Sequence, residues 1–124
     1  MANENLGIYE PGANITGRAS ADVTGKRFLA ITGNRSSGNI AVAHATAAGR
    51  VCGVSKYDAP SGEIVGVVRG NSRVTFVKAA GNIAAFAEVE VGTAGQAITK
   101  TSGIAVGYAV TAATSGNDAE ISLY

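Results

Sequence analysis

Cysteine, histidine and tryptophan are almost missing from this sequence, and each absence excludes a class of site. Cys52 is the only cysteine, so no disulfide can form within the chain. His44 is the only histidine, and without a cysteine cluster it cannot complete a recognisable zinc site. The absence of tryptophan disfavours a carbohydrate site built on stacked rings. We therefore expect no metal ion, no cofactor and a structural role for His44.

Charge is also scarce. Asp, Glu, Lys and Arg make up 15% of the 124 residues, and the net charge is +1, whereas about a quarter of an ordinary soluble domain is charged. Such a chain has no long-range field to attract nucleic acid or an anionic membrane, so we expect neither as a direct partner. Because 46% of the residues are apolar, part of the surface is expected to be covered by assembly.

Long hydrophobic runs are missing as well. No apolar run approaches the roughly 20 residues that a membrane-spanning helix needs. The first five residues lack the basic and apolar regions of a signal peptide. We therefore expect synthesis in a reducing cytoplasm, with Cys52 as a buried, unreactive thiol in its apolar run.

Glycine, in contrast, is abundant, and 17 glycines separate short apolar runs. The runs expected to form strands cover residues 28–32, 39–43, 51–54, 64–68, 73–77, 88–92, 104–110 and 119–124. A tight turn at 69–72 predicts a hairpin between the fourth and fifth of these runs. The pattern predicts an all-β fold, a small barrel or sandwich of short antiparallel strands. No repeat of fixed period is evident, which predicts one domain over residues 21–124.

Two stretches depart from the strand pattern. Residues 41–48 are rich in alanine, which makes a short helix near 43–48 the main alternative to a strand there. Residues 1–20 are rich in breakers and poor in apolar side chains, which predicts an extended N-terminal arm. Its anchoring candidates are Leu6, Ile8, Tyr9, Pro11 and Ile15.

Few residues suggest chemistry. Glu88 and Glu90 alternate on one predicted strand, where two carboxylates could divide acid and base roles, but the pattern is more typical of a solvated strand face. Lys26 follows a glycine as in a phosphate-binding loop, yet the upstream glycine and the following Ser or Thr are absent. Lys26, Arg27 and Arg35 form only a modest basic patch, and Lys78 is typical of a soluble strand end. These features predict a protein that is not an enzyme.

The order of the strand motifs adds a resemblance. The motifs are VCGVS at 51–55, GEIVGVV at 62–68, EVEVG at 88–92, GIAVGYA at 103–109 and the closing run at 119–123. Over residues 25–124 the chain resembles the head-decoration, or capsid cement, proteins of tailed bacteriophages.

The resemblance implies a barrel-like, usually trimeric β-domain on the outer surface of the phage head. Such a domain would bind the major capsid protein at three-fold or quasi-three-fold positions and stabilise the assembled shell, and the family has no catalytic residues. The arm commonly reaches onto the capsid, which makes the five anchoring candidates capsid-contact candidates here. The alternatives are another virion β-domain, from a tail tube or a fibre, and a glycan-binding β-module.

Overall fold

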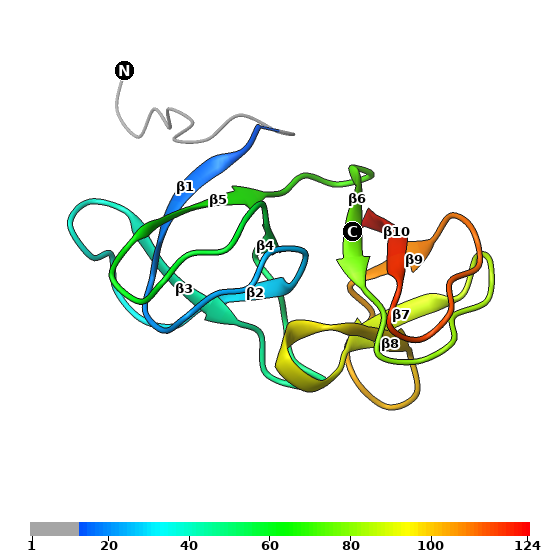
Figure 1. Ribbon diagram of the computed structural model, residues 1–124. Helices are drawn as coiled ribbons and strands as arrows, with labels where there is room; N and C mark the ends of the chain where they lie inside the picture. Colours follow the sequence, from blue (N-terminus) through cyan, green and yellow to red (C-terminus); the bar gives the residue numbers. More distant parts are fainter. Residues whose placement is uncertain (1–12) are drawn as a thin grey trace, which may run out of the picture.

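A computed structural model describes residues 13–124, and this part of the chain is built from short strands (Figure 1). The strands are β1 Ile15–Ala19, β2 Phe28–Ile31, β3 Ile40–His44, β4 Gly53–Ser55, β5 Ile64–Val68, β6 Val74–Lys78, β7 Glu88–Val91, β8 Ala97–Thr99, β9 Gly107–Ala109 and β10 Asp118–Leu123. One short 3-10 turn, Thr93–Gly95, precedes β8. The predicted all-β fold is confirmed.

The first five strands close into a barrel in the order β1-β3-β2-β4-β5, with β5 returning to β1. All neighbours are antiparallel except β1 and β3, which run parallel. Because every strand in this barrel has two partners, its backbone hydrogen-bonding groups are used inside the sheet and no edge strand remains. Figure 1 shows this barrel on the left of the molecule.

The last five strands form a second sheet in the order β6-β10-β9-β7-β8, on the right in Figure 1. Its strands follow one another as the strands of the first barrel do, with β6 to β10 taking the places of β1 to β5. The one difference is at the closure. The parallel β1–β3 pairing is reduced to a single parallel bridge between Ala79 and Ala97. The second sheet is therefore a second copy of the barrel, opened between β6 and β8.

Hydrogen bonds outside the strands repeat in the same way. The side chain of Asp22 accepts a bond of 2.9 Å from the Ser61 N–H, and Asn82 accepts one of 3.0 Å from Ser115. The isolated antiparallel bridge between Val23 and Ala59 recurs between Ile83 and Ala113. The sequence shows no repeat of fixed period, and the structure contains a repeat whose period varies along the chain. The two copies differ in period because the β2–β3 connection spans residues 32–39, whereas the β7–β8 connection spans only 92–96.

Two local predictions are wrong, and the alternative of a short helix near residues 43–48 is not realised. The turn at 69–72 connects the two barrels and makes no hairpin, because β5 already pairs with β1 and β4 while β6 pairs with β10. The alanine-rich stretch forms β3 and the turn after it, because pairing with β1 and β2 outweighs the helix preference of alanine. Ile15–Ala19 is strand β1, so the folded domain begins before residue 20 and the last part of the predicted arm belongs to the barrel.

The two copies share their packing. One core cluster lies within the first barrel and contains Leu29, Val42 and Val65. The other fills the second barrel, but it also contains Phe28 and Val54 from the first. Because neighbouring residues of a strand point to opposite faces, β2 sends Leu29 into one core and Phe28 into the other.

Candidate interaction surface

Residues with reactive or ligating side chains do not gather in the structure. Among residues 13–124 there is no cluster of three or more His, Cys, Asp or Glu side chains that could hold a metal ion. In the same part of the chain, no helix is long and apolar enough to cross a membrane. We therefore considered each candidate residue by its own contacts.

His44 serves as a hydrogen-bond acceptor for the backbone. Its Nε2 accepts a bond of 2.9 Å from the Thr24 N–H, which secures the loop before β2. Burial, and then the nearby positive charge of Arg27, lower the pKa of His44, so the imidazole is neutral at pH 7. This contact agrees with the structural role expected from the sequence.

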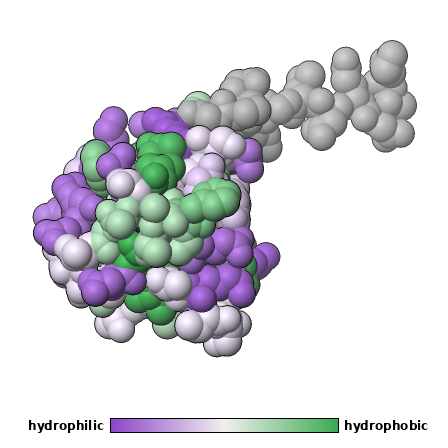
Figure 2. All heavy atoms as spheres, turned by 90° about the vertical axis from the view of Figure 1, so that its right-hand side faces the viewer, coloured by the Kyte–Doolittle hydropathy of each residue, from purple (hydrophilic) through white to green (hydrophobic). Residues whose placement is uncertain are grey.

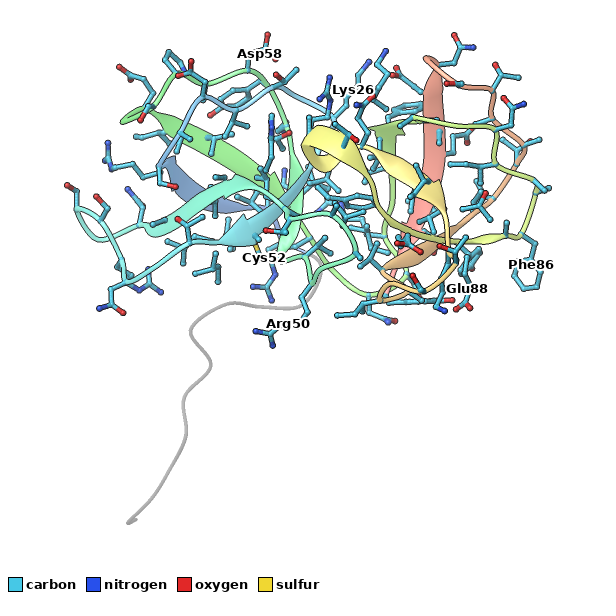
Figure 3. The ribbon with its side chains drawn as sticks, turned by 90° about the horizontal axis from the view of Figure 1, so that it is seen from below. Lys26, Arg50, Cys52, Asp58, Phe86 and Glu88 are labelled. Carbon is cyan, nitrogen blue, oxygen red and sulfur yellow. The ribbon has the colours of Figure 1, made fainter. Side chains whose placement is uncertain are left out.

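Cys52 lies just before β4, on the wall of an open groove of about 430 Å³ that Ile31 and Arg50 also line (Figure 3). Burial raises the pKa of the Cys52 thiol to about 11. A thiol of such high pKa holds almost no thiolate at neutral pH, and thiolate is the reactive form. The groove thus carries no activated nucleophile.

We expect native Cys52 to react with iodoacetamide at neutral pH about a hundredfold more slowly than the same residue in denatured protein, because the thiolate fraction falls with the raised pKa. Mass spectrometry of time points with and without denaturant measures both rates. Equal rates in the two conditions would contradict this placement of the thiol.

Glu90 departs from its prediction as part of a solvated face. Its side chain is only 4% exposed, and Oε1 accepts bonds of 2.5 Å from the Thr101 N–H and 3.1 Å from the Gly103 N–H. These backbone donors lower the pKa of the Glu90 carboxyl. The lowered pKa means that the network is complete at neutral pH and is lost as acid protonates Glu90. Glu88 is exposed, as predicted.

The basic residues of the predicted patch are held by intramolecular contacts. Lys26 Nζ lies 2.6 Å from Asp118 Oδ2, and Lys78 Nζ lies 3.5 Å from the other oxygen of the same carboxylate. Arg27 donates a bond of 3.0 Å to the carbonyl of Ala94, and Arg35 donates one of 2.9 Å to Gly38. The Lys26 and Arg27 contacts join the first barrel to the second, and the Arg35 contact closes its own loop. In the described residues, these side chains are thus held by the protein and do not form a phosphate-binding loop.

The most distinctive surface feature is an aromatic cluster of Phe86, Tyr108 and Tyr124 on the second barrel. The rings of Phe86 and Tyr108 meet edge to face at 5.2 Å, and those of Tyr108 and Tyr124 lie 6.1 Å apart. The Tyr124 hydroxyl donates a bond of 2.6 Å to Glu88 Oε2. Phe86 is nevertheless 78% exposed. In Figure 3 its ring projects outward at the right-hand end of the molecule.

Phe86 is held outward by its backbone. Its φ is 67°, in the left-handed region that a bulky residue rarely adopts. The Phe86 N–H donates a bond of 2.7 Å to the carbonyl of Ala109, which fixes this conformation. A large ring kept in water by a strained backbone is typical of a contact residue, because aromatic side chains are enriched in protein interfaces.

More apolar side chains are exposed on the outer face of the same sheet. Cross-strand register places Val74, Ser122, Tyr108 and Glu88 in one row. Val74 and Phe76, two residues apart on β6, are each about half exposed at 51% and 52%. The end-on view of this barrel in Figure 2 shows apolar side chains gathered at the centre of the face, with hydrophilic ones around them. The second barrel therefore carries an uncovered apolar surface.

Of the five residues predicted from the sequence as capsid contacts, the structure describes Ile15. Leu6, Ile8, Tyr9 and Pro11 fall outside the described residues. Ile15 is in β1, only 8% exposed, and packs in the first core. Its side chain stabilises the barrel and is not available to a partner.

Sequence reasoning missed the aromatic cluster because its members are distant in sequence. Phe86 stands in a run of alanines with no strand alternation, and only the fold brings it to Tyr108 and Tyr124. The one available signal was a large aromatic residue in a small-residue loop between two predicted strands.

Comparisons with known proteins agree with this picture. A family model described as phage cement protein matches residues 9–123. Among solved structures, the head fiber gp8.5 N base of bacteriophage phi29 is similar with a TM-score of 0.76 and 24% identity, over 90% of this chain and 93% of that one. At this identity the structural likeness supports the fold. No curated protein sequence matches the chain.

Proposed function

Because this chain belongs to the phage cement protein family and is a structural virion component that binds the capsid, we propose that it covers the outer surface of the assembled head and stabilises the shell. In this proposal it binds the major capsid protein as a homotrimer at three-fold or quasi-three-fold positions. The carrying observation is the family match over residues 9–123, which includes both barrels and not one module alone.

The physical features of the chain support this role. The ionisable side chains considered above are engaged in structural contacts, and exposed apolar and aromatic side chains gather on the second barrel. A protein that binds only the assembled lattice stabilises it by mass action, and the stabilisation grows with the logarithm of its free concentration relative to its dissociation constant. Three linked attachment points raise the effective concentration of each, so individual contacts can be weak.

Co-sedimentation with purified heads tests the proposal. We expect the protein to pellet with expanded, empty heads and not with unassembled capsid protein. In a separate assay on DNA-filled heads, we expect decorated heads to release their DNA at a higher temperature than undecorated ones. Protein that stays in the supernatant beside expanded heads would refute capsid binding.

A second candidate is favoured by the structural likeness to a head fiber base. There the chain would anchor a fibre on the capsid instead of covering the lattice. Gold-labelled antibody on intact virions separates the two, because a cement protein labels the whole head and a fibre base labels only the fibre attachment points.

The N-terminal segment remains the proposed capsid contact, with corrected bounds. We expect deletion of residues 2–12 to leave the barrels folded, because β1 begins at Ile15, and to weaken binding to expanded heads by about tenfold, through loss of the apolar contacts proposed for Leu6, Ile8 and Tyr9. Co-sedimentation at graded concentrations measures the change.

A matched pair of full-length variants controls for chain length. Replacing Leu6, Ile8 and Tyr9 together by serine is expected to weaken binding as the deletion does, whereas replacing Asn3 and Asn5 by serine is not. Unchanged binding by both the deletion and the apolar variant would exclude this segment as the contact.

A further inference from the structure

The internal repeat makes Lys26 and Phe86 equivalent residues. Each precedes the second strand of its barrel, and both have positive φ, 60° for Lys26 and 67° for Phe86. The Lys26 N–H donates to the carbonyl of Ser55 at 2.9 Å, and the Phe86 N–H donates to that of Ala109 at 2.7 Å. The same backbone geometry therefore presents a lysine from the first barrel and a phenylalanine from the second.

Within the chain, Lys26 is one of the contacts of the first barrel with the second. Its ammonium group pairs with Asp118 at 2.6 Å and lies 6.0 Å from the centre of the Phe76 ring. Its carbonyl oxygen accepts a bond of 2.9 Å from the Lys78 N–H. Asp118 and Lys78 are direct partners across β10 and β6, so Lys26 is bound by one cross-strand pair at the start of β10.

The first barrel carries the equivalent cross-strand pair at the start of β5. There Ile64 takes the place of Asp118, and Arg18 takes the place of Lys78, since these two are direct partners across β5 and β1. Ile64 is 48% exposed. Both members of the intramolecular ion pair thus have apolar, exposed equivalents: Phe86 in place of Lys26, and Ile64 in place of Asp118.

We infer that Phe86 of one copy packs on Ile64 and Arg18 of a second copy, in a head-to-tail contact that repeats the Lys26 contact between the barrels. The inference rests on the proposed homotrimer and identifies its interface. An apolar pair replaces the ion pair, and Thr16 stands in the first barrel where Phe76 lies beside Lys26 in the second. The contact between copies would repeat only the side-chain interactions. In the second barrel the Lys26 backbone occupies the opening between β6 and β8, whereas in the first barrel the β1–β3 pairing closes the equivalent opening.

The two surfaces lie where such a contact requires them. Phe86 is at one end of the long axis in Figure 3, and β5 begins towards the opposite end of the molecule in Figure 1. A contact between two different surfaces cannot close a two-fold dimer. It produces a ring when the rotation closes and a filament when it does not. A ring of three copies would use every Phe86 and every Ile64.

Charge-swap variants of the full chain test the contact. We expect Phe86→Lys and Ile64→Asp each to weaken self-association by about tenfold or more in sedimentation equilibrium, because each sets a charge against an apolar residue. The double variant is expected to recover association, since it recreates the Lys26–Asp118 pair between copies. Ile31→Asp, at a site 55% exposed and outside both surfaces, is the control and should associate as the original protein does.

Three results would overturn the inference: a monomeric original protein, single variants that associate normally, or a double variant that stays dissociated while circular dichroism shows it folded. Co-sedimentation with expanded heads is measured in parallel. Capsid binding by a monomeric protein would overturn the contact and the homotrimer but not capsid binding, whereas a stable oligomer that does not bind heads would overturn the proposed capsid binding and not the contact.

Discussion

Gly107→Ala should be among the most damaging single substitutions in this chain, with an expected loss of about 3 kcal/mol or more in unfolding free energy. A Cβ atom at Gly107 would lie 2.5 Å from the carbonyl oxygen of Ser122 and 2.8 Å from Ile121 Cγ2. Both neighbours belong to β10, which pairs with β9 at this point in the middle of the second sheet. Backbone cannot move aside there without breaking the strand pair.

The equivalent glycine of the first barrel provides an independent replicate. At Gly53 a Cβ atom would lie 2.5 Å from Val67 Cγ1 and 2.6 Å from the carbonyl oxygen of Val68, so Gly53→Ala should cost a similar amount. Gly81→Ala is the matched control, because no atom lies within 4 Å of its Cβ position, and it should leave stability unchanged or slightly raised. Urea denaturation followed by circular dichroism measures all three. A Gly107→Ala protein as stable as Gly81→Ala would contradict the close β9–β10 packing.

Phe28→Ala is expected to cost about 3–5 kcal/mol, the range for removing a fully buried phenylalanine. Phe28 is 0% exposed and belongs to the core cluster of the second barrel, although β2 is a strand of the first. The substitution should therefore loosen the second barrel more than the first. Hydrogen exchange should show faster exchange in β7 and β10 than in β3 and β5.

Phe76→Ala provides the control for the same chemical change. Phe76 is 52% exposed on β6, so its removal should cost less than about 1 kcal/mol. Equal losses for the two phenylalanines, or equal acceleration of exchange in both barrels, would show that Phe28 does not join the cores.

Most individual strands could be predicted from the sequence, because glycine and short apolar runs are local signals. Pairing could not. The turn at 69–72 has the composition of a hairpin turn, yet it connects the two barrels. Nothing within those four residues encodes that β5 pairs with β1 and β4 and not with β6. The two missed strands, β1 and β8, are short and carry polar residues, so their periodicity is weak.

The surface was less predictable than the fold. The exposed ring of Phe86 is distinctive only through its φ of 67° and its contact with Tyr108, and both depend on three-dimensional structure. The burial of Glu90 depends on residues 101–103, which follow it by a whole strand. Alternation correctly predicts Glu88 as solvated and gives the wrong result for Glu90 because it cannot include a loop that folds back over the strand.

The closure of the first barrel has a consequence for solubility. A chain with a net charge of +1 has little electrostatic repulsion to keep its copies apart, and open strand edges in such a protein would recruit one another into aggregates. The first barrel has no edge, and in the second the Lys26 carbonyl already occupies the N–H of Lys78 on edge strand β6. Strand addition is therefore blocked on the first barrel and at Lys78, so that side chains, which carry specificity, govern which surfaces meet there.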